Sequence, residues 1–206
     1  MPLLTSKVVP VHQEVDENAK KIVVKMYAMP LETFFRKFRG HRYPKIESFE
    51  TYMKERELTE FAFMPPGSTI IYISHEWVGT DHVDPRGDQL KHLVLVLKRL
   101  HEGEVRRTDM DAFHSLLYKH THTTTAEEWK HMLDPQTTYI FYDGFCMPKE
   151  KRDKGFRMIP EFVKRCDFMI ILAPGCTHFD KIDPRTGRKM NLCYRTYRLN
   201  AMCVFE

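Results

Sequence analysis

Three short runs of consecutive apolar residues stand out along the chain. They are residues 69–73 (Thr-Ile-Ile-Tyr-Ile), 137–142 (Thr-Thr-Tyr-Ile-Phe-Tyr) and 167–173 (Asp-Phe-Met-Ile-Ile-Leu-Ala). Their apolar positions are continuous rather than alternating, which is typical of strands buried on both faces of a sheet. We therefore expect Ile71, Ile73, Ile140, Phe141, Phe168, Ile170 and Ile171 to be buried in one sheet.

Helical periodicity separates these runs. The clearest stripe lies in residues 89–100, and it consists of Leu90, Leu93, Val94, Leu97 and Leu100. Shorter helices are expected around residues 111–118, 126–132 and 159–164. Strand, helix, strand, helix, strand is the pattern of right-handed crossovers, so the sequence predicts an α/β fold with a parallel sheet and flanking helices.

The first 66 residues have a different pattern. Leu31, Phe34, Phe35 and Phe38 recur at helical spacing, and a second short helix is indicated near Tyr52. Met-Pro-Pro-Gly-Ser at 64–68 is the strongest break in the chain. We therefore expect a helical N-terminal segment over 1–66 and an α/β domain over 67–206.

The composition narrows the class of protein. The chain has 206 residues, 42% of them hydrophobic and 29% charged, with a formal net charge of +4. These values are typical of a soluble globular protein of about one domain. No apolar stretch is long enough to predict a spanning helix, and no secretory signal is indicated. Five Cys without a spacing motif favour reduced thiols, so we expect a cytoplasmic protein without a membrane partner.

Two basic runs leave nucleic-acid binding open. Residues 34–45 mix five cations with aromatic rings, and residues 185–198 contain Arg185, Arg188, Lys189, Arg195 and Arg198. Such cations can bind phosphates and such rings can stack on bases. The alternative is a solvated helical face with its apolar stripe turned inward, and we favour it for both runs.

Most familiar catalytic motifs are missing from the sequence. It contains no P-loop, no glycine-rich dinucleotide fingerprint, no zincin helix and no nucleophile elbow. The histidines at 114, 120, 122 and 131 lack nearby ligands at metal-binding spacing, so no metal site is predicted. Cys146 has no adjacent base, which indicates an inert thiol.

The remaining candidates are polar residues just after the predicted strands, where α/β proteins bind ligands. They are Ser74, His75, Glu76, Asp81, Asp84 and Asp143, together with Glu206 far along the chain. Asp84 precedes a proline, so starting a helix is an equally good interpretation of it.

Four motifs in order resemble the TIR-like (Toll/interleukin-1 receptor-like) superfamily, in particular the SH-x-W variant of protist and algal proteins. They are Ile-Tyr-Ile-Ser-His-Glu-Trp (71–77), Tyr-Ile-Phe-Tyr-Asp-Gly-Phe-Cys-Met-Pro-Lys (139–149), the segment 159–172, and Asn-Ala-Met-Cys-Val-Phe-Glu (200–206), which is similar to the W-C-x-x-E element. The resemblance covers about residues 69–206 and implies a flavodoxin-like sheet.

The resemblance also implies a function. In enzymatic members the Glu of W-C-x-x-E cleaves NAD⁺ at the nicotinamide–ribose bond, which places a catalytic role on Glu206. It implies NAD⁺ as substrate, no required cofactor, and a nucleotide cleft that contains Ser74, His75, Trp77 and Asp143. Trp77 would stack on nicotinamide, and Ser74 would serve the phosphates.

The match departs from the motif at its end. Met202 replaces the aromatic residue and Glu206 is the last residue printed, so we expect the domain to continue beyond it. The fourth and fifth strands of the fold are absent, and residues 102–136 are longer than the usual connection. The alternative function is a non-enzymatic module that associates with itself or with other TIR-like domains, for which the charged loop 144–157 is suited.

Overall fold

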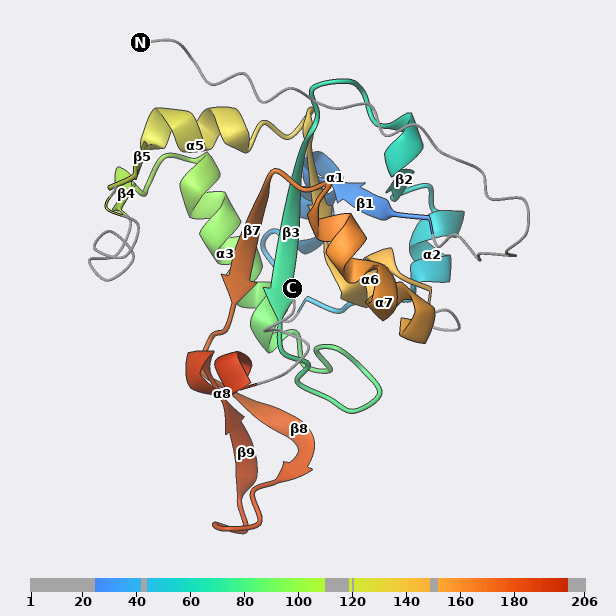
Figure 1. Ribbon diagram of the computed structural model, residues 1–206, viewed down its shortest axis with the longest axis vertical. Coiled ribbons are helices and arrows are strands. Elements are labelled where there is room, and N and C mark those ends of the chain that lie inside the picture. Colours follow the sequence, from blue (N-terminus) through green and yellow to red (C-terminus); the bar gives the residue numbers. More distant parts are fainter. Residues whose placement is uncertain (1–24, 42–43, 110–118, 120, 149–151, 200–206) are drawn as a thin grey trace.

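The computed structural model describes residues 25–41, 44–109, 119, 121–148 and 152–199. Its centre is a five-stranded sheet in the order β2-β1-β6-β3-β7 (Figure 1). These strands are β1 (Tyr27–Pro30), β2 (Thr59–Glu60), β3 (Thr69–His75), β6 (Thr138–Phe141) and β7 (Phe168–Leu172). The three strands predicted from the apolar runs pair in parallel, with Ile71 opposite Ile140 on one side and Phe168 on the other.

The sheet is mixed rather than wholly parallel, which corrects one expectation. β1 pairs antiparallel with β6 and with β2, so two strands from residues 25–66 form one edge of the same sheet. They are therefore part of the α/β fold and not a purely helical lead-in. β1 is four residues long and ends at Pro30, so its sequence carries little strand signal.

Helices cover both faces of the sheet. Phe162 of α7 (Arg152–Val163) packs edge-on against Phe141 of β6, and Tyr72 stacks beside that ring. Ile71 and Ile140 alternate with these residues and point to the opposite face. In Figure 1, α3 (Asp88–His101) and α7 lie on opposite sides of β3.

The N-terminal helices are joined to the sheet by aromatic packing. α1 (Leu31–Phe38) buries Leu31, Phe34, Phe35 and Phe38, and α2 (Phe49–Lys54) buries Tyr52. Rings of Phe34, Phe38 and Tyr52 gather around Phe145 of α6 (Asp143–Cys146), with centroids 5.6 to 6.5 Å away. Phe145 therefore links the two parts of the chain into one core.

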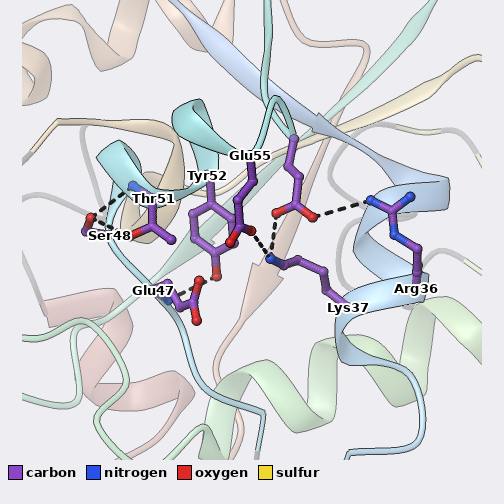
Figure 2. A network of polar contacts seen from close by, with 8 residues as sticks. Arg36, Lys37, Glu47, Ser48, Thr51, Tyr52 and Glu55 are labelled. Carbon is purple, nitrogen blue, oxygen red and sulfur yellow. Dashed lines mark hydrogen bonds and ion pairs between the residues drawn. The ribbon is translucent and has the colours of Figure 1, made fainter.

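Ion pairs join α1 to the residues that directly follow α2 (Figure 2). Lys37 lies 2.7 Å from Glu55 and 2.6 Å from Glu57, and Arg36 pairs with Glu57 at 3.3 Å. Burial lowers the pKa of Lys37, but hydrogen bonds to both carboxylates outweigh it and raise the pKa to about 12. Arg39 pairs with Glu102. The apolar stripe of the first basic run is thus buried, and Arg36, Lys37 and Arg39 are neutralised by ion pairs. This agrees with the interpretation of that run as a helical face whose apolar stripe is turned inward.

The last described segment is a hairpin with a short helix. β8 (Cys176–Ile182) and β9 (Lys189–Leu192) pair antiparallel, and α8 (Tyr194–Leu199) follows. The hairpin projects from the bottom of the molecule in Figure 1. The prediction of a solvated helical face over residues 185–198 is therefore wrong for most of that run. Most of these residues form a hairpin turn and a strand.

Two further elements lie in the long connection. β4 (Arg107–Asp109) and β5 (Thr123–Thr125) form a small hairpin, and α5 (Ala126–Met132) starts with a capping box between Thr125 and Glu128. The 3₁₀ turn η1 (Phe61–Phe63) precedes the Pro-Pro-Gly break. The helix expected at 111–118 lies outside the described residues. In the part of the chain that is described, no helix has the length and apolar character needed to cross a bilayer.

β7 is an edge strand of the sheet, and part of it is exposed. Met169 and Ile171 are 42% and 41% exposed, and Phe168 and Ile170 are only partly buried. The burial predicted for Ile171 is therefore wrong. A continuous apolar run does not distinguish a central strand from an edge strand, since the difference depends on what packs beside it.

We expect Phe145→Ala to lower the free energy of unfolding by about 3–5 kcal/mol, because it removes the ring that α1, α2 and α6 share. Phe63→Ala is the matched control: Phe63 is 75% exposed, and we expect a change within about 0.5 kcal/mol. Urea denaturation measures both. An equal loss in the two variants, or two separate unfolding transitions, would contradict a single shared core.

Candidate functional site

Polar side chains gather at the carboxyl ends of β3 and β6. His75 is the last residue of β3, and Asp143 begins α6 just after β6. His75 Nε2 lies 2.6 Å from Asp143 Oδ1, and both side chains are almost completely buried. The His75 ring also stacks on Tyr142, with centroids 4.4 Å apart. Two strand ends are thus joined by one short hydrogen bond.

Gln89 determines how many protons this pair holds. Its amide nitrogen donates to the Glu76 backbone carbonyl at 2.8 Å, so its oxygen is the atom 3.1 Å from His75 Nδ1. An oxygen there can only accept, so Nδ1 carries a hydrogen. A second proton then lies between Nε2 and Oδ1. The His75–Asp143 pair is therefore neutral as a whole, which makes its burial less costly than that of a lone carboxylate.

Trp77 completes the network from the β3 side. Its indole Nε1 donates to the second carboxylate oxygen of Asp143 at 3.0 Å. The ring is half-buried, so it has one part in the core and one part at the surface. Asp143 therefore orients an imidazole and an indole at the same edge of the sheet.

The loop between β3 and α3 is held by its own backbone and by Asp84. Val78 donates to Val83 across the loop at 2.8 Å. The buried Asp84 carboxylate accepts from the backbone of Asp88 and Leu90, both at 2.9 Å. Burial raises the pKa of Asp84, against these hydrogen bonds. Asp84 thus starts α3. Of the two interpretations that the sequence left open for this residue, the structure agrees with the helix start.

Gly87 is required at the end of this loop. Its φ is +70°, and a Cβ built on it would lie 2.1 Å from the Pro44 carbonyl oxygen. Residue 87 therefore needs both the left-handed conformation and the absence of a side chain. A shallow cavity of about 400 Å³ lies beside it, lined by Pro44, Lys45, Pro85, Arg86 and Asp88.

Residues from α8 reach the same edge. The Tyr197 hydroxyl lies 2.6 Å from Ser74 Oγ, and Thr196 Oγ1 donates to the Glu76 carboxylate at 2.8 Å. Ser74 and Tyr197 are buried, and Glu76 is half-buried. A carboxylate is therefore held beside Trp77 by a residue 120 positions away in the chain.

The Tyr142 hydroxyl is fully buried and forms no hydrogen bond with any described residue. Burial raises its pKa well above the usual range, and the charges of Asp84, Asp143 and Cys176 act in the same direction. An unpaired buried hydroxyl costs about 1–3 kcal/mol, so native structures pair nearly all of them.

Of the residues predicted to line one cleft, the structure joins His75, Trp77 and Asp143 by hydrogen bonds, whereas Ser74, on the same strand as His75, bonds to Tyr197 of α8. Glu206 and Met202 lie outside the described residues, and Asp81 is exposed. Sequence reasoning missed Gln89, Tyr142, Thr196 and Tyr197. The sequence offered one clue to Gln89, because it is a polar residue beside the apolar stripe of a predicted helix. It offered no such clue to Thr196 and Tyr197.

The cysteines divide into buried and exposed thiols. Cys146, Cys166, Cys176 and Cys193 are all free. Burial raises the pKa of Cys146, that of Cys166 to about 12 and that of Cys176 to about 11. Hydrogen bonds from the backbone of Thr196 and Arg195 lower the pKa of Cys193. Among the described residues, no cluster of three or more His, Cys, Asp or Glu could hold a metal ion.

Comparisons with protein-family models, with curated proteins and with solved structures each found no match for this chain.

We expect Asp143→Ala to lower the free energy of unfolding by about 3–5 kcal/mol, because His75 and Trp77 would lose a shared buried acceptor. Asp109→Ala is the control, since Asp109 pairs with Arg107 at the surface, and we expect little change. Urea denaturation near neutral pH compares the two. A loss for Asp143→Ala no larger than the control would show that the network contributes nothing to stability.

Thiol alkylation tests the cysteine environments. At pH about 7.5, iodoacetamide should modify Cys193 at least about tenfold faster than Cys166 or Cys176, because a lower pKa leaves more thiolate. Peptide mass spectrometry over time gives the rates, and labelling in urea should remove the difference. Equal native rates would contradict the assignment.

Proposed function

We propose that the chain is a TIR-like domain with a flavodoxin-like arrangement of its parallel strands. It binds a nucleotide of the NAD⁺ type at the carboxyl edge of β3 and β6 and hydrolyses the nicotinamide–ribose bond. The observation that carries the proposal is the joining of His75 and Trp77 to Asp143 across two strand ends. In open α/β sheets this edge is where ligands bind.

Trp77 is the residue proposed to recognise the nucleotide base. The bond from its Nε1 to Asp143 fixes the plane of the indole, and Gln89 and Tyr142 hold His75 behind it. A ring oriented before binding loses little entropy when a nicotinamide or adenine stacks on it. Such stacking contributes about 1–3 kcal/mol per base.

Cleavage of the nicotinamide–ribose bond requires a carboxylate near the ribose but no proton donor. Loss of nicotinamide builds oxocarbenium character at the ribose C1′, which a nearby carboxylate stabilises. The leaving group departs as neutral nicotinamide from a cationic ring, so no proton donor is required. Water then adds to C1′ and loses a proton, which gives ADP-ribose.

Two carboxylates are candidates for this role. The resemblance assigns it to Glu206. Glu76 precedes Trp77 in the chain, and its carboxylate accepts a hydrogen bond from Thr196. Separate substitutions distinguish them, because glutamine keeps the shape of either side chain and removes its charge.

The second candidate function is self-association without catalysis. Its supporting observation is β7, an edge strand with Met169 and Ile171 on its exposed face. An edge strand presents unpaired backbone groups that a second copy of the chain can pair with. Either function suits a cytoplasmic protein, since the described thiols are unpaired.

NAD⁺ binding is tested by tryptophan fluorescence. The chain has two Trp, so Trp129→Phe leaves Trp77 as the reporter. We expect saturable quenching by NAD⁺ in that variant, and about tenfold weaker binding in Trp77→Ala measured by calorimetry. Trp129→Phe should bind as the wild type does, because Trp129 bonds to Thr108 in the β4–β5 hairpin.

Nicotinamide release from the full-length protein is the second readout. A loss of about 100-fold or more in Glu206→Gln, with binding retained, would agree with the assigned role. The same loss in Glu76→Gln instead would move the role to Glu76. Absence of NAD⁺ binding together with concentration-dependent dimerisation in sedimentation would favour the self-association function.

A further inference from the structure

The β8–β9 hairpin carries a concentration of positive charge. Residues 176–199 contain six cationic side chains and two carboxylates. The cations are Lys181, Arg185, Arg188, Lys189, Arg195 and Arg198, and all of them are exposed. The tip of the hairpin lies away from the sheet (Figure 1).

The two carboxylates of the segment form no ion pair with these six cations, and six positive charges less two negative ones leave a net charge of +4. Asp180 accepts from the backbone of Thr80 at 2.8 Å, which ties β8 to the loop after β3. Asp183 accepts from the backbone of Arg185 at 2.9 Å, inside the turn at the tip. Both carboxylates are thus used to build the hairpin and to anchor it.

None of the six cations forms an ion pair with a described residue, whereas many cations elsewhere do. Lys189 donates to the Phe179 carbonyl. Lys181, Arg185 and Arg188 make no side-chain hydrogen bond among the described residues. The first basic run shows the contrast, since Arg36, Lys37 and Arg39 are all paired with glutamates.

The shape of the segment restricts what it can bind. Its tip, residues 183–188, is Asp-Pro-Arg-Thr-Gly-Arg and has no apolar side chain to insert into a bilayer. Phe179 and Ile182 are exposed on the strand behind the tip. A two-stranded antiparallel ribbon fits the major groove of a duplex, where cations contact phosphates and apolar groups contact base edges.

We propose that the β8–β9 hairpin binds the backbone of double-stranded DNA, with Lys181, Arg185 and Arg188 on its phosphates. The hairpin is held in position for this by Phe179, whose backbone N–H donates to the Val78 carbonyl at 2.6 Å, and by Asp180. This binding is separate from the proposed nucleotide site and does not depend on it.

The test uses fluorescence anisotropy of a labelled DNA duplex of about twenty base pairs. Lys181→Ala/Arg185→Ala/Arg188→Ala should weaken binding at least about tenfold near 0.1 M salt. Each phosphate contact contributes about −0.9 to the slope of log K against log salt, so the triple variant should lose about 2.7 of that slope. Circular dichroism checks that the variant is folded.

The matched control removes three exposed cations that are ion-paired elsewhere: Arg99→Ala/Arg107→Ala/Lys164→Ala. Its net charge equals that of the hairpin variant, and its binding should stay within about twofold of the wild type. Equal weakening by the two triple variants would overturn the proposal, since it would indicate non-specific attraction. Three other results would overturn the proposal as well. They are tighter binding to a single strand of the same length, binding to anionic vesicles without binding to the duplex, and no binding to the duplex.

Discussion

The short bond between His75 and Asp143 is the interaction on which the carboxyl edge of the sheet depends. It joins the end of β3 to the start of α6, and both side chains are almost completely buried. The polar atoms of a buried imidazole and carboxylate need partners, because an unmet buried group costs about 1–3 kcal/mol, which is more than the net contribution of a typical hydrogen bond. That requirement accounts for Gln89 at the start of α3 and for the position of the Trp77 indole.

The same requirement explains the order in which the edge is built. Gln89 can meet His75 only if α3 begins at Asp88, and α3 begins there because Asp84 caps it and Gly87 allows the chain to pass Pro44. Helix start, loop conformation and side-chain protonation thus depend on one another. A substitution at any of these positions is expected to act on the pair.

The sequence predicted those features that depend on local pattern. Continuous apolar runs located β3, β6 and β7, and periodicity located α1 and α3. β1 was missed because four residues ending in proline carry little strand signal, and Ile171 was predicted to be buried because an edge strand can have the same apolar run as a central one. Of the site, the residues next to strand ends were found. Tyr197 was not, because its contact with Ser74 spans 123 positions and leaves no local trace.

The ring cluster around Phe145 has a consequence for how this protein can evolve. Phe34, Phe38 and Tyr52 come from the N-terminal segment, yet they pack on the helix whose first residue is Asp143. Recombination at the Pro-Pro-Gly break would expose those rings and remove the support beneath Asp143. Residues 25–66 are therefore not an interchangeable module, and insertions are better tolerated in the break than cuts are.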